Sequence, residues 1–365
     1  MIPLFLDCDP GIDDAVALGY LVCQPDVEIT GVAASGGNVP TRQVVRNALA
    51  WLELAGRGDV PVHAGAELPL RAAEQGSTPV YADDTHGSLG TGHAVLPGPT
   101  TTPSTVPAAQ AWVEAARAHP GELIGVVTGP CTNLALALQV EPQLPELLRR
   151  LFIMGGAFNY RGNTKPTTEW NTDFDPESTA RVYQGFGAAL QLPAIGPIEA
   201  TEAVVMTPQR LERILTSAAD PQWRAWLEQI AEALRFYFEF HESDGHGYLA
   251  QIHDPYVVAA AIGWARHPEA GIPWTDQPRF GRGGRQGFAD REAGHVPAAG
   301  TSTVVVDVEL SGTLTRGETV ADWLGRWDRE PNVELIRRLD ADSFLDHLEQ
   351  TLTAGPVSAY QRRVI

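Results

Sequence analysis

Lysine is nearly absent from this chain. Of 365 residues only Lys165 is a lysine, so arginine carries almost all of the positive charge. Lys and Arg together number 26 against 45 Asp and Glu, a net charge of 26 − 45 = −19. Binding to a phosphate backbone requires clustered positive charge, and this sequence contains no basic stripe. The composition therefore predicts that nucleic acid is not a partner.

Cysteines and long apolar runs are also scarce. The three cysteines, at positions 8, 23 and 131, are too few and too scattered for a disulfide framework or a zinc site. No apolar stretch approaches the ~18 residues of a membrane span. The N-terminal apolar run stops at Asp7 and lacks the basic segment of a signal peptide. We expect a cytoplasmic protein with reduced thiols and no membrane partner.

The most informative segment is Asp7-Cys8-Asp9-Pro10-Gly11-Ile12-Asp13-Asp14, in which four of eight residues are carboxylates. It follows the apolar run 2–6, which is typical of a buried strand, and a helical apolar pattern begins at Ala15. Acidic residues at a helix start also complement the helix dipole, but this does not account for Asp7 and Asp9. The carboxylates are predicted at the carboxyl end of a strand, where open α/β sheets bind ligands.

Strand-like runs alternate with helical patterns along most of the chain. This order predicts the α/β class, with an open, mostly parallel sheet of Rossmann-like type and flanking helices. We expect a single domain over 1–365, with a Gly/Arg/Pro-rich surface insertion at about 273–300. The expected strands are 2–6, 27–34, 60–63, 123–127, 151–154 and 303–310. The expected helices are 41–55, 207–240 and 342–352, and a long polar loop is expected at 67–105.

Three further segments carry polar groups next to predicted strands or helices. Thr128-Gly129-Pro130 offers a backbone carbonyl to a ligand, or is an ordinary helix start with Thr132 or Asn133 as N-cap. The loop with Asn163, Glu169 and Asn171 suits a polyol such as a sugar, or is simply a turn-forming loop. In His253-Asp254-Pro255 the aspartate is either functional or the N-cap of the next helix, and His253 is a candidate proton donor.

Taken together and in this order, the four segments resemble the nucleoside hydrolase family, the inosine–uridine-preferring nucleoside N-ribohydrolases. The resemblance spans roughly residues 2–265 and 303–353, and includes Gly317–Asp322 and Pro331-Asn332-Val333. It implies Ca²⁺-dependent hydrolysis of the N-glycosidic bond of inosine/uridine-type ribonucleosides to base and ribose. It also implies a homodimer or homotetramer that binds small-molecule nucleosides, and a role in nucleoside salvage.

The resemblance also implies a role for each site residue. One Ca²⁺ per subunit would be held by Asp9, Asp14, Asp254 and the carbonyl of Thr128, which suits a cation that takes 6–8 oxygen ligands. Asp9 would act as general base on a metal-bound water, and His253 would protonate the leaving base. The ribose would contact Asp13, Asn38, Asn163, Glu169 and Asn171. The base would contact His86, Tyr237 and His241.

Two other functions were weighed against this one. A haloacid-dehalogenase-like phosphohydrolase also places Asp-x-Asp after its first strand, but it needs a positioned lysine, and Lys165 lies in the predicted ribose loop. A non-catalytic nucleoside- or ribose-binding protein on the same scaffold would be expected to have lost a catalytic or metal carboxylate. The sequence retains them all, so hydrolysis is the preferred hypothesis, with the base preference left open.

Overall fold

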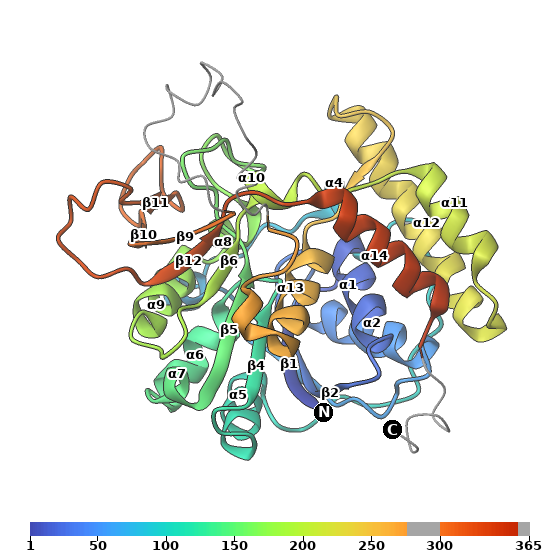
Figure 1. Cartoon of the computed structure of the whole chain (residues 1–365), viewed down its shortest axis with the longest axis horizontal. Helices are drawn as coiled ribbons and strands as arrows, with labels where there is room; N and C mark the ends of the chain where they lie inside the picture. Colours follow the sequence, from blue (N-terminus) through green and yellow to red (C-terminus); the bar gives the residue numbers. More distant parts are fainter. Residues whose placement is uncertain (276–299, 357–365) are drawn as a thin grey trace.

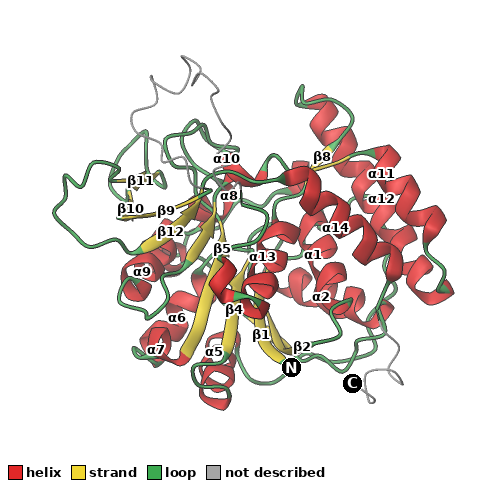
Figure 2. Cartoon of the chain, viewed as in Figure 1, coloured by secondary structure: helices red, strands yellow, loops and turns green. Residues whose placement is uncertain are grey.

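The computed structural model describes residues 1–275 and 300–356. An eight-stranded sheet runs through the molecule in the order β3-β2-β1-β4-β5-β6-β12-β9 (Figures 1 and 2). All neighbouring strands are parallel except β12 and β9. The predicted α/β class and the mostly parallel sheet are therefore confirmed, while the insertion predicted at about 273–300 falls almost entirely outside the described residues.

The strands of this sheet are short, and two small antiparallel pairs accompany it. The main sheet contains β1 Ile2–Cys8, β2 Val27–Ala34, β3 Val62–Ala64, β4 Leu123–Val127, β5 Leu148–Met154, β6 Ala194–Gly196, β9 Thr301–Val304 and β12 Val333–Ile336. The pairs are β7 Val205–Met206 with β8 Ala250–Gln251, and β10 Val306–Val308 with β11 Thr319–Ala321.

Helices cover both faces of the sheet and pack into two separate apolar clusters. The first face carries α1 Ile12–Val22, α2 Thr41–Leu54, α12 Pro221–Ser243, α13 Asp254–Arg266 and α14 Ala341–Ala354. The second carries α5 Ala108–Ala118, α6 Thr132–Val140, α7 Leu144–Leu147 and α9 Pro176–Phe186. The remaining helices are α3 Leu70–Gln75, α4 Asp83–His86, α8 Trp170–Phe174, α10 Ile198–Thr201, α11 Pro208–Ser217 and the 3₁₀ turn Pro268–Ala270.

Strand β1 shows why these residues form a buried strand. Leu4 and Leu6 pack into the first apolar cluster and Phe5 into the second, because successive side chains point to opposite faces of a sheet. Asp7 points to the same side as Phe5 and accepts hydrogen bonds from Trp112, Ser35 and Asn133. Asp7 therefore ties β1 to its neighbours, and the chain then turns so that Asp9 and the start of α1 lie at the carboxyl edge of the sheet.

Several predicted boundaries were wrong. The run 303–310 is not one strand, because β9 pairs with β12 whereas β10 pairs with β11. The helical segment 207–240 is split into α11 and α12, since Asp220 caps the second helix and Pro221 begins it. The loop 67–105 contains the short helices α3 and α4.

The N-caps proposed for two helices were also wrong. Thr132 and Asn133 do not cap α6, which begins after Cys131, and their side chains instead bond Asp175 and Asp7. Asp254 is the first residue of α13 rather than its cap, and His253 occupies the N-cap position. The two segments still begin helices, so only the cap assignments are wrong.

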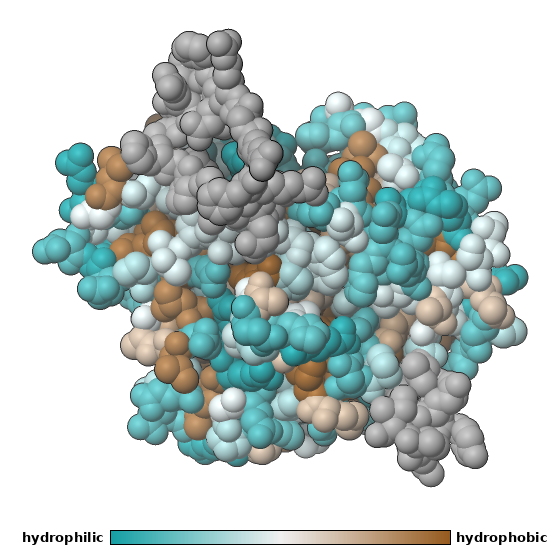
Figure 3. All heavy atoms as spheres, viewed as in Figure 1, coloured by the Kyte–Doolittle hydropathy of each residue, from teal (hydrophilic) through white to brown (hydrophobic). Residues whose placement is uncertain are grey.

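Part of the surface can be described by its hydropathy. The face in Figure 3 is mostly hydrophilic over α11, α12 and α14. Among the described residues, no helix combines the length and hydropathy that a membrane crossing requires.

Candidate active site

A cavity of about 390 Å³ lies at the carboxyl edge of the sheet, where β1, β2, β4 and β5 end. All thirteen predicted site residues line it. They are Asp9, Asp13, Asp14, Asn38, His86, Thr128, Asn163, Glu169, Asn171, Tyr237, His241, His253 and Asp254. Parallel strands bring their carboxyl ends to one edge, which is why Asp9, Asn38 and Thr128 meet here. Helices α4, α12 and α13 add His86, Tyr237, His241 and Asp254.

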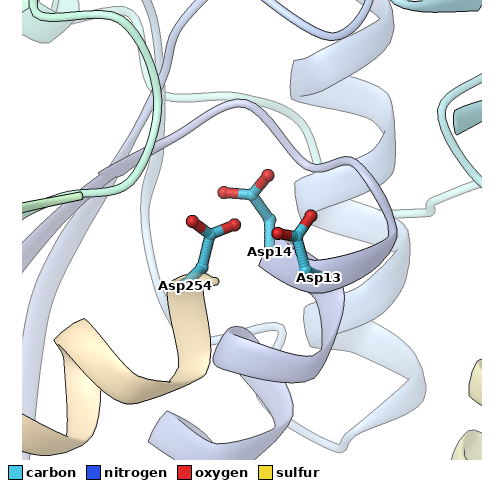
Figure 4. Close-up of side chains that lie close together, drawn as sticks. All are labelled: Asp13, Asp14 and Asp254. Atoms are coloured by element: carbon cyan, nitrogen blue, oxygen red, sulfur yellow. The ribbon is translucent and has the colours of Figure 1, made fainter. Parts of the chain in front are cut away.

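Three carboxylates form the acidic centre of this cavity. Asp13 and Asp14 stand on the first turn of α1 and Asp254 on the first turn of α13, and their side chains converge (Figure 4). One carboxylate oxygen from each lies within 4.8 Å of the others, and each residue is at most 6% exposed. Asp14 also accepts hydrogen bonds from the Thr128 hydroxyl at 2.8 Å and the Gly11 amide at 3.1 Å.

Asp9 lies beside this group of three and has one free carboxylate oxygen. Its Oδ2 accepts a hydrogen bond from the Asn38 amide at 2.8 Å, and the Asn38 side chain donates to Asp14 at 3.3 Å. Asp9 Oδ1 is buried and has no hydrogen-bond partner among the described residues. A Cβ added to Gly37 or Gly129 would lie 2.0 Å or 2.7 Å from an Asp9 carboxylate oxygen. The glycines therefore leave space that the Asp9 carboxylate occupies.

The donor set fits a hard cation. Four buried carboxylates meet here, and none of the four forms an ion pair in the described part of the chain. A buried carboxylate without a partner is costly, and a cation that takes oxygen ligands would remove that cost. The unpartnered Asp9 Oδ1 shows that ligand capacity remains in the cluster. The residues present can therefore hold a divalent metal ion.

Burial and mutual repulsion raise the pKa values of these carboxyls. Burial, with the neighbouring Asp14 carboxylate, raises the pKa of Asp9 well above its ordinary value. Burial, with Asp13 and Asp14, does the same to the pKa of Asp254. Both shifts indicate that these carboxyls favour protons and that a cation would compete with them.

The loop after β5 supplies the residues predicted to hold ribose. Glu169 caps α8, with its carboxylate accepting the amides of Gly156, Asn171 and Thr172 at 2.7–3.1 Å. Asn163 Oδ1 accepts the Trp170 amide at 2.9 Å. Asn171 donates to the Thr128 carbonyl at 2.7 Å. These side chains are held in place by the backbone at the wall of the cavity.

Helix α4 and the C-terminal half of α12 form the other end of the cavity. The ring of Tyr237 lies between His86 and His241, with centroid distances of 5.3 Å and 4.5 Å. The aromatic residues of 223–240 divide between two places. Trp223 and Trp226 stack in the core, whereas Tyr237 and Phe240 line the cavity. Burial lowers the pKa of His86 to about 3, so this histidine is neutral.

His253 joins the acidic centre to this end of the cavity. Its backbone amide donates to Asp13 at 3.3 Å, and its Nδ1 lies 2.9 Å from the hydroxyl of Thr201. Burial, followed by the charge of His241, lowers the pKa of His253 to about 3. The imidazole is therefore neutral.

Sequence reasoning missed several residues at this site. Tyr81, Trp170 and Gln251 line the cavity, and Thr201 lies directly behind His253. Trp170 stands between two predicted residues, Glu169 and Asn171, and this position in the sequence could have indicated that it lines the cavity. Thr201 sits on a four-residue helix with no motif around it, so nothing in the sequence marks it.

Comparisons with known proteins identify the family to which this chain belongs. Residues 4–346 match the family model described as inosine-uridine preferring nucleoside hydrolase. The chain belongs to the nucleoside hydrolase family. It is therefore an N-glycosyl hydrolase that acts on ribonucleosides, and the dehalogenase-like and non-catalytic alternatives are set aside.

Relatives match this nucleoside hydrolase over nearly its whole length. The pyrimidine-specific ribonucleoside hydrolase RihA of Enterobacter sp. (strain 638) is 30% identical over 352 residues, covering 96% of this chain and 97% of that protein. RihA of Klebsiella pneumoniae (strain 342) is 31% identical over 353 residues, covering 96% and 98%. The plant nucleoside hydrolase PpNRh1 superposes with a TM-score of 0.78 at 27% identity, covering 96% and 99%. A purine-preferring ribonucleoside hydrolase from Gardnerella vaginalis has the same fold, with a TM-score of 0.78 at 24% identity, covering 96% and 98%.

Proposed function

We propose that this nucleoside hydrolase uses one Ca²⁺ per chain to hydrolyse ribonucleosides to free base and ribose. The observation that carries the proposal is the buried acidic cluster, with an unpartnered oxygen on Asp9 and no ion pair among its four described carboxylates. We assign Asp9, Asp14, Asp254 and the Thr128 carbonyl as ligands. The all-oxygen set favours Ca²⁺ over softer ions. Bound there, the ion would hold a water and the ribose hydroxyls and lower the pKa of that water.

The proposed reaction follows from the positions of the side chains. Asp9 takes a proton from the attacking water, whose oxygen bonds to C1′ of the ribose. The C1′–N bond breaks with both electrons moving to the base. While the C1′–N bond breaks and before the C1′–O bond is complete, positive charge develops on the ribose ring. The buried carboxylates around Asp13 stabilise this charge. Asn38, Asn163, Glu169 and Asn171 fix the sugar through their remaining polar atoms, which positions C1′ against the water.

His86, Tyr237, His241 and His253 are assigned to the base. His253 is the candidate group that assists departure of the leaving base. The curated relatives are named pyrimidine-specific, so we propose uridine and cytidine as the first substrates to examine, with inosine beside them. The predicted homodimer or homotetramer stays a prediction that light scattering would check.

The proposal is tested by ribose release from uridine, cytidine, inosine, adenosine and their 5′-phosphates. Each substrate is assayed with Ca²⁺, after EDTA treatment and after Ca²⁺ is restored. We expect release from unphosphorylated nucleosides that EDTA abolishes and Ca²⁺ restores. Release that is indifferent to EDTA would refute the metal assignment. If no nucleoside releases ribose although Ca²⁺ is bound, the substrate is a different N-glycoside.

A further inference from the structure

Thr201 lies directly behind His253, on the side away from the cavity. It is the last residue of α10, is fully buried, and is not part of the cavity lining. Its hydroxyl oxygen is 2.9 Å from His253 Nδ1. Among the described residues, nothing forms a hydrogen bond with the other ring nitrogen, Nε2, of this cavity-lining histidine. Nδ1 is therefore held by the protein, whereas Nε2 is available to a ligand.

The direction of the Thr201 hydrogen bond decides which nitrogen of His253 carries the proton. A hydroxyl has one proton to donate, and Thr201 has two acceptors in reach, His253 Nδ1 at 2.9 Å and the Pro197 carbonyl at 3.2 Å. That carbonyl already accepts the amides of Ala200 and Thr201, both at 3.0 Å. The contact to Nδ1 is the shorter of the two and the carbonyl already has two donors, so we assign the hydroxyl proton to Nδ1.

We propose that Thr201 is a positioning residue that holds His253 as the Nε2–H tautomer, so that His253 donates a hydrogen bond to the departing base. The inference rests on the proposed function, because it deepens the role of a residue already assigned to the leaving group. As the C1′–N bond breaks, its electron pair moves onto the base, and Nε2–H stabilises that charge. The water proton goes to Asp9, and the released base takes its own proton from solvent. An imidazole that accepts a hydrogen bond at Nδ1 carries its one proton on Nε2, and it polarises the base without transferring that proton.

Two other histidines of the cavity, His86 and His241, have their tautomers set by the backbone. His86 Nδ1 accepts the Ile12 amide at 3.1 Å, which places its proton on Nε2. His241 Nδ1 lies 2.9 Å from the Tyr237 carbonyl, which can only accept, so the proton of His241 is on Nδ1. Of these three histidines, only His253 depends on a side-chain hydroxyl. A single substitution at Thr201 therefore tests the tautomer without touching the cavity wall.

The first test is ¹⁵N NMR of the histidine rings in the Ca²⁺-loaded enzyme, with His253 assigned from its absence in His253→Ala. We expect a protonated, pyrrole-type Nε2 and an unprotonated, pyridine-type Nδ1. A pyrrole-type Nδ1 in the wild-type enzyme would overturn the proposal. This reading needs neither a folded Thr201 variant nor a known substrate, so it decides the tautomer even if the proposed reaction fails.

The second test compares two leaving groups in Thr201→Val. Uracil needs the hydrogen bond to leave, whereas 4-nitrophenolate from 4-nitrophenyl riboside is a stable anion and does not. We expect kcat for uridine to fall by roughly tenfold or more, as when a residue that orients a functional histidine is removed, with KM nearly unchanged. Turnover of 4-nitrophenyl riboside should be retained. Equal losses on both substrates, or none on uridine, would contradict the proposal.

Two controls separate positioning from a structural role. Thr201→Ser keeps the hydroxyl and should restore most of the uridine turnover, and adding Thr201→Val to His253→Ala should cost nothing further. Thr179 is a buried threonine on α9 with the same hydroxyl contact to the carbonyl four residues earlier. Thr179→Val should therefore leave the ratio of the two substrates unchanged. Wild-type enzyme that cleaves neither substrate would refute the proposed function instead, because the NMR result stands apart from it.

Discussion

Replacing Asp254 by asparagine should stabilise the metal-free protein while weakening its response to Ca²⁺. One carboxylate oxygen each of Asp13, Asp14 and Asp254 lies within 4.8 Å of the others. At an effective dielectric constant of about 20, one ionised pair at this distance costs about 3.5 kcal/mol. Asp254→Asn removes its share of that repulsion and also removes one proposed ligand.

The expected size follows from the length of the chain. Unfolding entropy of about 2.1 cal/mol/K per residue gives roughly 0.77 kcal/mol/K for 365 residues. Relief of about 3.5 kcal/mol therefore corresponds to a rise in Tm of about 4–5 °C. Protonation of the raised-pKa carboxyls already relieves part of the repulsion, which makes the rise smaller.

The assay is calorimetric unfolding of wild type and Asp254→Asn in EDTA and across a Ca²⁺ titration. The variant should melt higher in EDTA and gain less from Ca²⁺, because the gain follows RT ln(1 + [L]/Kd). A metal-free variant that melts lower, with an undiminished Ca²⁺ gain, would refute the reasoning.

Asp175 provides a matched control for this prediction. It is equally buried, but its carboxylate accepts hydrogen bonds from the Leu70 and Ser178 amides and the Thr132 hydroxyl. Asp175→Asn turns an NH₂ group toward donors and should cost about 1–3 kcal/mol. The two Asp→Asn changes should therefore move the Tm of the metal-free protein in opposite directions.

Three further predictions concern the proposed general base Asp9, a glycine beside it and the distant carboxyl of Glu199. Asp9→Asn should fold and lower kcat by about 10²–10⁴, which is about 2.7–5.5 kcal/mol; near-wild-type kcat in steady-state assays would remove Asp9 as the base. Gly37→Ala puts a Cβ 2.0 Å from Asp9 Oδ2 and should weaken Ca²⁺ binding by calorimetry, whereas Gly98→Ala, whose nearest neighbour is at 3.8 Å, should not; equal affinities would contradict this. Burial raises the pKa of Glu199 from 4.5 to about 7, so the folded state binds more protons than the unfolded state between these pH values. The free energy of unfolding that Glu199 contributes therefore falls by about 3 kcal/mol as the pH rises from 4.5 to 7. Glu199→Gln should flatten that part of the pH–stability curve, and an unchanged slope in denaturant unfolding would disprove it.

The local motifs predicted the strand and the helix start on either side of Asp9. In Asp9–Asp14 a buried strand, a Pro-Gly turn and a helix start follow one another within a few residues, and each has its own pattern. Strands β6 and β12 could not be predicted, because three or four residues carry no usable periodicity. The break at Val305 was equally hidden, since three consecutive valines show no turn signal.

The joining of distant segments depends on strand order, which the sequence does not show directly. The resemblance to nucleoside hydrolases predicted that Asp254 and His86 approach Asp9, and the structure places all three in one cavity. Thr201 lies outside that prediction. Its role depends on a single hydrogen bond across 52 residues, and only the folded structure shows this contact.

The most direct test of the account is a Ca²⁺ titration of EDTA-treated enzyme during uridine cleavage, at enzyme concentrations above the Kd for Ca²⁺. The account predicts that ribose release rises in proportion to added Ca²⁺ and reaches its plateau at one ion per chain, with Asp254→Asn giving no such break. Full activity before any Ca²⁺ is added, or a plateau unrelated to the number of chains, would contradict it.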